Sequence, residues 1–110
     1  METGVNLADS GWVGYRPQIK VLDCTIRDGG LMNNSRFEDG VVAAVYRACV
    51  DAGIDYMEIG YRNSRKIFAP DKYGVWRHSH EDDIRRIVGD NPTNLKLAVM
   101  ADAEKSDYRN

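Results

Sequence analysis

Apolar and polar residues follow two different periods along this chain, and the changes of period predict where its strands and helices lie. Short apolar runs rich in β-branched residues at 19–26, 55–60 and 95–100 predict three strands. Between them, apolar residues at 38–52 and 80–89 recur three and four positions apart, as on one side of an amphipathic helix. Strands that alternate with helices in this way predict an α/β fold with a parallel sheet.

Residues with strong turn preferences mark the ends of these elements. Gly53 follows the first predicted helix, and Ser79 precedes the second as a candidate N-cap. Residues 31–37 and the unusually long segment 61–79 are predicted to be loops. The segment 1–17, with its scattered glycines, is predicted to be an irregular N-terminal extension.

The first predicted strand ends in Arg27-Asp28-Gly29-Gly30, which is the strongest chemical signal in the chain. Asp28 offers the carboxylate oxygens that hard divalent cations prefer. Arg27 offers a planar set of donors to a carboxylate or an enolate oxygen. Gly29 and Gly30 allow positive φ and the close approach of a ligand. The alternative is an ordinary surface ion pair before a glycine turn.

The longer string Asp23-Cys24-Thr25-Ile26-Arg27-Asp28-Gly29-Gly30 resembles the signature at the first barrel strand of the HMG-CoA lyase-like (DRE-TIM) metallolyases. A second stretch, Ala52 to Tyr61, is similar to the end of that family's first helix and its second strand. The resemblance implies that residues 18–110 form the first three βα units of a (β/α)8 TIM barrel. Because a whole barrel takes about 250 residues, we interpret the chain as an N-terminal portion of one.

The resemblance also implies an activity. Members of the family are metal-dependent aldolases and lyases that cleave or form a carbon–carbon bond of an α-keto acid, such as pyruvate, through an enolate. Arg27 would be the catalytic residue that stabilises the enolate, and Asp28 would be one ligand of a divalent metal such as Mg²⁺ or Mn²⁺. The family's other ligands are two histidines near the seventh strand, so we expect these 110 residues to be inactive alone.

Three further residues are expected to support Arg27 from the inner face of the barrel: Asp23, Thr25 and Glu58. Alternation along the first strand places Asp23 and Thr25 on one face and Cys24 on the other. Glu58 would fix the guanidinium of Arg27, although a purely structural ion pair is an equal alternative.

The loops supply the candidates for substrate contact, which are Asn33, Asn34 and Arg62. The segment 61–79 is basic and aromatic, so it is expected either to bind an anionic substrate or to pack as a solvated loop. The chain departs from the family after the two glycines. The 4-hydroxy-2-oxovalerate aldolases have a histidine there that serves as the catalytic base, whereas this chain has Leu31 and Met32.

The pair His78-Ser79-His80 has the spacing of the family's paired metal histidines. It precedes three acidic residues at the start of a predicted helix rather than ending an apolar strand. Acidic residues suit the positive end of a helix dipole. We therefore interpret His78 and His80 as part of a helix N-terminus and not as metal ligands.

The composition of the chain argues against some classes of function. The net charge is −2, with 15 basic and 17 acidic residues interspersed, so no basic face supports nucleic-acid binding. No signal peptide or membrane span is visible, and Cys24 and Cys49 are expected to be reduced, which together predict a cytoplasmic protein. The rival interpretation is a non-catalytic α/β interaction module that retains the strand motif. Unpaired sheet edges would favour a homo-oligomer.

Overall fold

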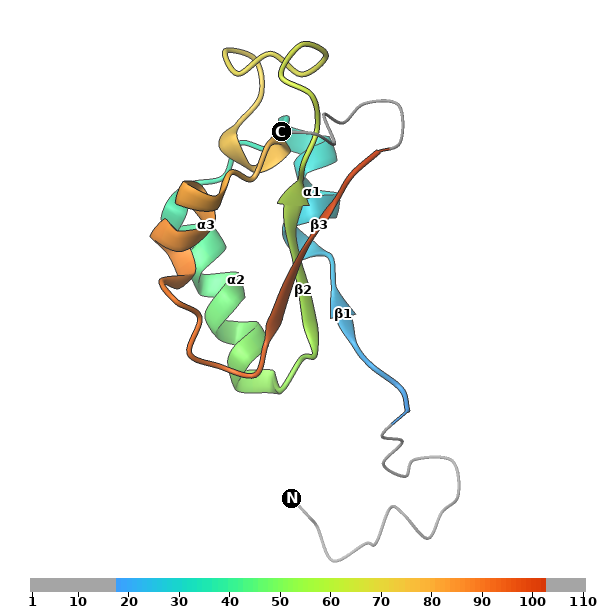
Figure 1. Ribbon diagram of the computed structural model, residues 1–110, viewed down its shortest axis with the longest axis vertical. Coiled ribbons are helices and arrows are strands. Elements are labelled where there is room, and N and C mark those ends of the chain that lie inside the picture. Colours follow the sequence, from blue (N-terminus) through green and yellow to red (C-terminus); the bar gives the residue numbers. More distant parts are fainter. Residues whose placement is uncertain (1–17, 103–110) are drawn as a thin grey trace, which may run out of the picture.

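The computed structural model describes residues 18–102, which form a three-stranded sheet with helices packed against it (Figure 1). The elements in chain order are β1 (Leu22–Asp23), α1 (Thr25–Asn33), α2 (Asp39–Ala52), β2 (Tyr56–Tyr61), the 3-10 helix η2 (Val75–Arg77), α3 (Glu81–Val88) and β3 (Lys96–Met100). Helices α2 and α3 lie together on one side of the sheet, and α1 lies near β1 at the end toward which the strands run. The predicted extension at 1–17 lies outside the described residues.

The sheet is parallel, with its strands in the order β1-β2-β3. Leu22 is opposite Tyr56, and Met57 is opposite Leu97. The register shifts between Glu58 and Gly60, so β2 contains an irregularity close to its C-terminal end. The prediction of an α/β fold with a parallel sheet is confirmed, and so are both later strands and both amphipathic helices, within two residues at each end.

The core lies between the sheet and the pair α2 and α3. Val42, Tyr46 and Cys49 are buried on α2 at spacings of four and three, as the periodicity predicts. They meet Met57 and Ile59 of β2, which are fully buried. Full burial of one such side chain stabilises the fold by roughly 1.5–3 kcal/mol. The end of α2 is also as predicted, because Gly53 takes a φ of +72° at its C-cap.

The predicted strand at 19–26 is wrong over most of its length. Only Leu22–Asp23 pairs as a strand, and the chain turns into α1 at Thr25. The cause is local: the Asp23 carboxylate accepts hydrogen bonds from the Thr25 backbone N–H at 3.2 Å and from the Thr25 hydroxyl at 2.7 Å. A side-chain acceptor at this position satisfies a free donor of the first helical turn. Arg27 and Asp28 therefore lie on a helix that follows the strand.

The two glycines of the motif have a different role from the predicted one. Gly29 and Gly30 lie within α1, and neither has the positive φ expected of them. A Cβ atom on Gly30 would lie 2.6 Å from the Ser35 hydroxyl oxygen, so glycine is needed for the close approach of the next segment. The predicted loop at 31–37 is thus partly helical, and α1 ends where Asn34 adopts a φ of +56°.

The long connection after β2 is folded back onto the molecule around one buried arginine. The Arg77 guanidinium lies over the rings of Tyr61, Phe68 and Tyr73, at 4.7, 4.9 and 4.8 Å from their centroids. It also donates to the Ser35 hydroxyl at 2.9 Å and to the Gly30 carbonyl at 3.1 Å. Phe68 and Tyr73 therefore pack within this loop, as in one of the two alternatives that the sequence leaves open.

The start of α3 differs from the prediction. Ser79 is not the N-cap, because its hydroxyl donates to the Trp76 carbonyl and its backbone takes a φ of +47°. His80 is the N-cap residue and makes no capping hydrogen bond through its side chain. Three acidic residues follow in the first turn, as expected from the helix dipole: Glu81, Asp82 and Asp83.

Candidate functional site

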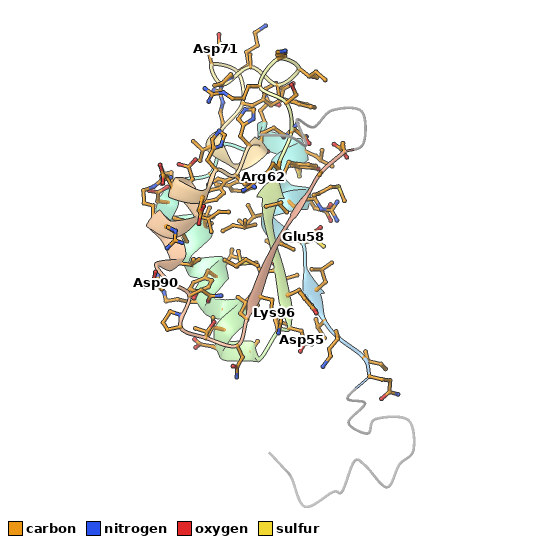
Figure 2. The ribbon with its side chains drawn as sticks, in the orientation of Figure 1. Asp55, Glu58, Arg62, Asp71, Asp90 and Lys96 are labelled. Atoms are coloured by element: carbon orange, nitrogen blue, oxygen red, sulfur yellow. The ribbon has the colours of Figure 1, made fainter. Side chains whose placement is uncertain are left out.

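Arg27 and Glu58 form the centre of the candidate site. Glu58 projects from β2 toward α1 (Figure 2), and its Oε1 accepts a hydrogen bond of 2.8 Å from Nε of Arg27. The two side chains are 20% and 11% exposed, so the ion pair is largely shielded from water. The hydrogen bond to Glu58 is the main cause of the raised pKa of Arg27, so the guanidinium keeps its positive charge. The predicted pairing of these residues is present.

Cys24 belongs to the same cluster, although the alternation of the sequence placed it on the opposite face. Its thiol donates to Glu58 Oε1 at 3.2 Å, and Arg27 Nη2 lies 3.5 Å from the sulfur. The hydrogen bond to Glu58 is the main cause of the raised pKa of Cys24. The error follows from the early start of α1: once the strand ends at Asp23, its period of two no longer predicts where Cys24 points.

Asp28 lies beside the guanidinium on the solvent side. Its Oδ1 accepts a hydrogen bond of 2.8 Å from Arg27 Nη1, and the side chain is 63% exposed. Such a carboxylate can give one ligand to a divalent cation. Within residues 18–102, no three histidine, cysteine or acidic side chains are grouped closely enough to hold a metal ion. One exposed carboxylate does not by itself make a metal site, because a divalent cation needs several ligands.

Asp23 and Thr25 are the neighbours of Cys24 in the chain. They hydrogen bond to each other, and no hydrogen bond within the described residues joins either of them to Arg27. Asp23 acts instead on Cys49 of α2, whose pKa is raised first by burial and then by the charge of Asp23. The structure gives this pair a role in starting α1, which carries Arg27.

The three candidates for substrate contact all take part in fixing loops. Asn33 donates through Nδ2 to the Arg36 carbonyl at 2.8 Å, and the Asn34 carbonyl accepts the Gly74 N–H at 2.8 Å. Arg62 donates to the Ser79 carbonyl at 2.7 Å. The Asn34 and Arg62 contacts tie the end of α1 and the end of β2 to the long connection, whereas the Asn33 contact is local.

His78 is buried and incompletely paired. The residue is 4% exposed, and Nδ1 lies 3.1 Å from the Asn63 carbonyl oxygen. Nε2 is buried without a hydrogen-bond partner among the described residues. The ring of His80 lies nearly parallel, with centroids 6.1 Å apart. Neither histidine joins Asp28 in a group of three potential metal ligands in this part of the chain.

The arrangement can bind and stabilise an oxyanion. Glu58 holds Nε of Arg27 from the sheet side. Among residues 18–102, the hydrogen-bond partners of the Nη atoms are the exposed Asp28 and the Cys24 thiol, which is a weak acceptor. A cation held in one position needs little reorganisation when negative charge develops beside it.

Within 18–102, none of the helices has the length and apolar character required to cross a membrane.

Comparison of the chain with protein-family models, with curated proteins and with solved structures gave no match.

Proposed function

We propose that this chain supplies the first three βα units of a (β/α)8 barrel that carries out metal-dependent aldol chemistry on an α-keto acid. The observation that carries the proposal is the position of Arg27: a shielded guanidinium, held by Glu58, just beyond the end of a parallel strand. In barrels of this kind the chemistry takes place where the strands end. The resemblance of Asp23 to Gly30 to the first-strand signature of the metallolyases supports the same assignment.

The sheet itself is compatible with continuation into a barrel. Strands consecutive in the sequence are neighbours in the sheet, and both outer strands have an edge without a partner in residues 18–102. Apolar side chains of the first strand region, such as Val21 and Leu22, are about half exposed. Further strands would cover them and complete the ring.

In this proposal each residue has one task. Arg27 stabilises the negative charge that develops on the substrate oxygen as the bond beside the ketone breaks or forms. Glu58 holds Nε of Arg27, and Cys24 contacts both partners, so the guanidinium keeps one orientation. Asp28 would hold a divalent cation together with residues from elsewhere, and that cation would polarise the substrate carbonyl.

Deuterium exchange at the methyl group of pyruvate tests the proposal without knowledge of the second substrate. Formation of an enolate removes a methyl proton, and its reversal in D₂O returns a deuteron, which proton NMR detects. We expect the whole protein to accelerate this exchange in the presence of Mg²⁺ or Mn²⁺ and to lose the effect with a chelator. Exchange at the rate of the metal salt alone would favour the rival interpretation, a non-catalytic α/β module.

A further inference from the structure

Two large apolar side chains of α1 are exposed to water beside the charged residues of the candidate site. Leu31 is 65% exposed and Met32 is 92% exposed. Within residues 18–102, no other large apolar side chain is as exposed as Met32. Single exposed apolar residues are common on protein surfaces, so the position of these two relative to Arg27 and Asp28 decides whether they matter.

The geometry of α1 joins the apolar pair to the charged pair. Leu31 follows Arg27 by four positions and Asp28 by three, and Met32 follows Asp28 by four. Residues at these spacings are neighbours on a helix surface, with about 5–6 Å between their Cβ atoms. Helical side chains also lean toward the N-terminus of the helix, so Leu31 and Met32 lean toward the turn that carries Arg27 and Asp28. The four residues form one continuous strip along α1.

The hydrogen bonds of Arg27 show which end of its guanidinium meets this strip. Glu58 accepts from Nε at 2.8 Å, whereas Asp28 accepts from Nη1 at 2.8 Å. Because Asp28 belongs to the strip and is 63% exposed, Nη1 lies at the polar end of the strip and Leu31 and Met32 lie at its apolar end. A substrate oxygen beside Nη1 would thus bring the remaining substrate atoms close to two apolar side chains.

We propose that the α-keto acid bound at Arg27 carries an unbranched apolar chain, which lies on Leu31 and Met32. The inference rests on the proposed function and narrows its substrate class. One helical turn separates the polar and apolar ends of the strip, so a chain of about four carbons suits the rise of about 5.4 Å. The flexible thioether chain of Met32 can adapt to such a chain.

Three keto acids provide the test: pyruvate, 2-oxohexanoate with its longer alkyl chain, and 2-oxoglutarate, whose longer chain ends in a carboxylate. Each is titrated with Mg²⁺ against the whole protein labelled with ¹³C-methyl methionine, and the Met32 resonance is identified by its loss in Met32→Gln. We expect 2-oxohexanoate to shift this resonance saturably and to bind about tenfold more tightly than the other two, because buried methylene groups strengthen binding. The resonance of Met57, which is fully buried in the core, should stay unchanged.

Leu31→Gln and Met32→Gln should each reduce the preference for 2-oxohexanoate over pyruvate about tenfold. Both side chains are exposed and glutamine is a good helix former, so we expect the variants to fold. Val41→Gln is the control, since it removes an exposed apolar side chain from α2 and should leave the preference unchanged.

Deuteration of pyruvate in the same samples separates this inference from the proposed function. A protein that deuterates pyruvate but binds all three acids equally, or loses its preference equally in the Val41 variant, would overturn the apolar substrate alone. A protein that neither deuterates pyruvate nor binds any of the acids would overturn the proposed function and this inference together.

Discussion

Arg27 forms two ion pairs that differ in their exposure to water. The partner behind it, Glu58, is shielded, and the partner beside it, Asp28, is largely exposed. Surface ion pairs contribute little to stability, whereas loss of one member of a shielded pair leaves an uncompensated charge. The same guanidinium is therefore a structural element on its Nε side and available for ligands on its Nη side.

Under the proposed function, Arg27→Ala is expected to slow pyruvate deuteration by the whole protein strongly while metal affinity stays largely intact. The loss should reach about 100-fold to 1,000-fold, because the fixed cation is removed from the developing charge. Asp28→Ala should instead weaken the binding of Mn²⁺ itself. Exchange rates and calorimetric Mn²⁺ titrations of both variants measure the two effects. Equal loss of metal in both would mean that Arg27 only supports the site.

The exposed Arg85 on α3 provides the matched control for removal of an arginine. Arg85→Ala should change neither exchange nor metal affinity. Because Arg27→Ala also leaves Glu58 without its cation, Arg27→Lys is needed as well: it keeps the charge but not the planar set of donors. Folding of each variant is checked by its thermal transition.

Glu58→Gln should make Cys24 react faster with iodoacetamide. The pKa of Cys24 is raised mainly by its hydrogen bond to Glu58, so removal of that carboxylate lowers the pKa. More thiolate is then present at a given pH, and thiolate is the reactive form. Cys49 is the internal control, since its pKa is raised mainly by burial. Unchanged labelling of Cys24 between pH 7 and 9 would contradict the contact.

At the scale of elements, the sequence predicts α2, α3, β2 and β3 well because each is specified by its own periodicity. The first strand is overpredicted because a short segment rich in apolar residues, such as 19–26, can belong to either a strand or a helix. The deciding contact is the local pair of hydrogen bonds between Asp23 and Thr25, which hydrophobicity does not detect. The Arg77 cage consists of the rings of Tyr61, Phe68 and Tyr73 with Ser35 and Gly30. It could not be predicted from the sequence, because it joins segments that are distant in the chain.

Gly60→Ala should destabilise the fold by about 1–3 kcal/mol. A Cβ at this position of β2 would collide with the Trp76 carbonyl oxygen and lie 2.7 Å from the Ser79 hydroxyl. Gly40→Ala is the opposite control: it has no atom within 4 Å of the added carbon and lies in α2, where alanine is favoured by about 1 kcal/mol. Urea denaturation measures both changes, and a stable Gly60→Ala protein would mean that η2 shifts freely away from β2.

At the scale of the whole molecule, the described sheet has two edges and an incompletely covered apolar region. Ile19, Val21 and Leu22 are exposed near β1, which has no partner on its outer side within residues 18–102. Free edges and exposed apolar surface both favour association.

We therefore expect these 110 residues, prepared alone, to form oligomers or aggregates in light scattering. Val21→Lys should reduce this association, because it places a charge next to the unpaired edge. Met32→Lys is the comparison, since Met32 is even more exposed but lies on α1. A compact monomer at high concentration, or equal effects of the two substitutions, would speak against edge pairing and favour a self-sufficient module.

The Arg77 cage has a consequence for the order in which the chain folds. The hydrogen bonds from this guanidinium to Ser35 and Gly30 join residues 42 and 47 positions apart. Closing chain segments of that length costs entropy before any contact is gained, whereas α2 and α3 form from neighbours in sequence. The segment between β2 and α3 should consequently be the last to become ordered. Its amide protons should then exchange with solvent through openings that leave the sheet and α2 intact.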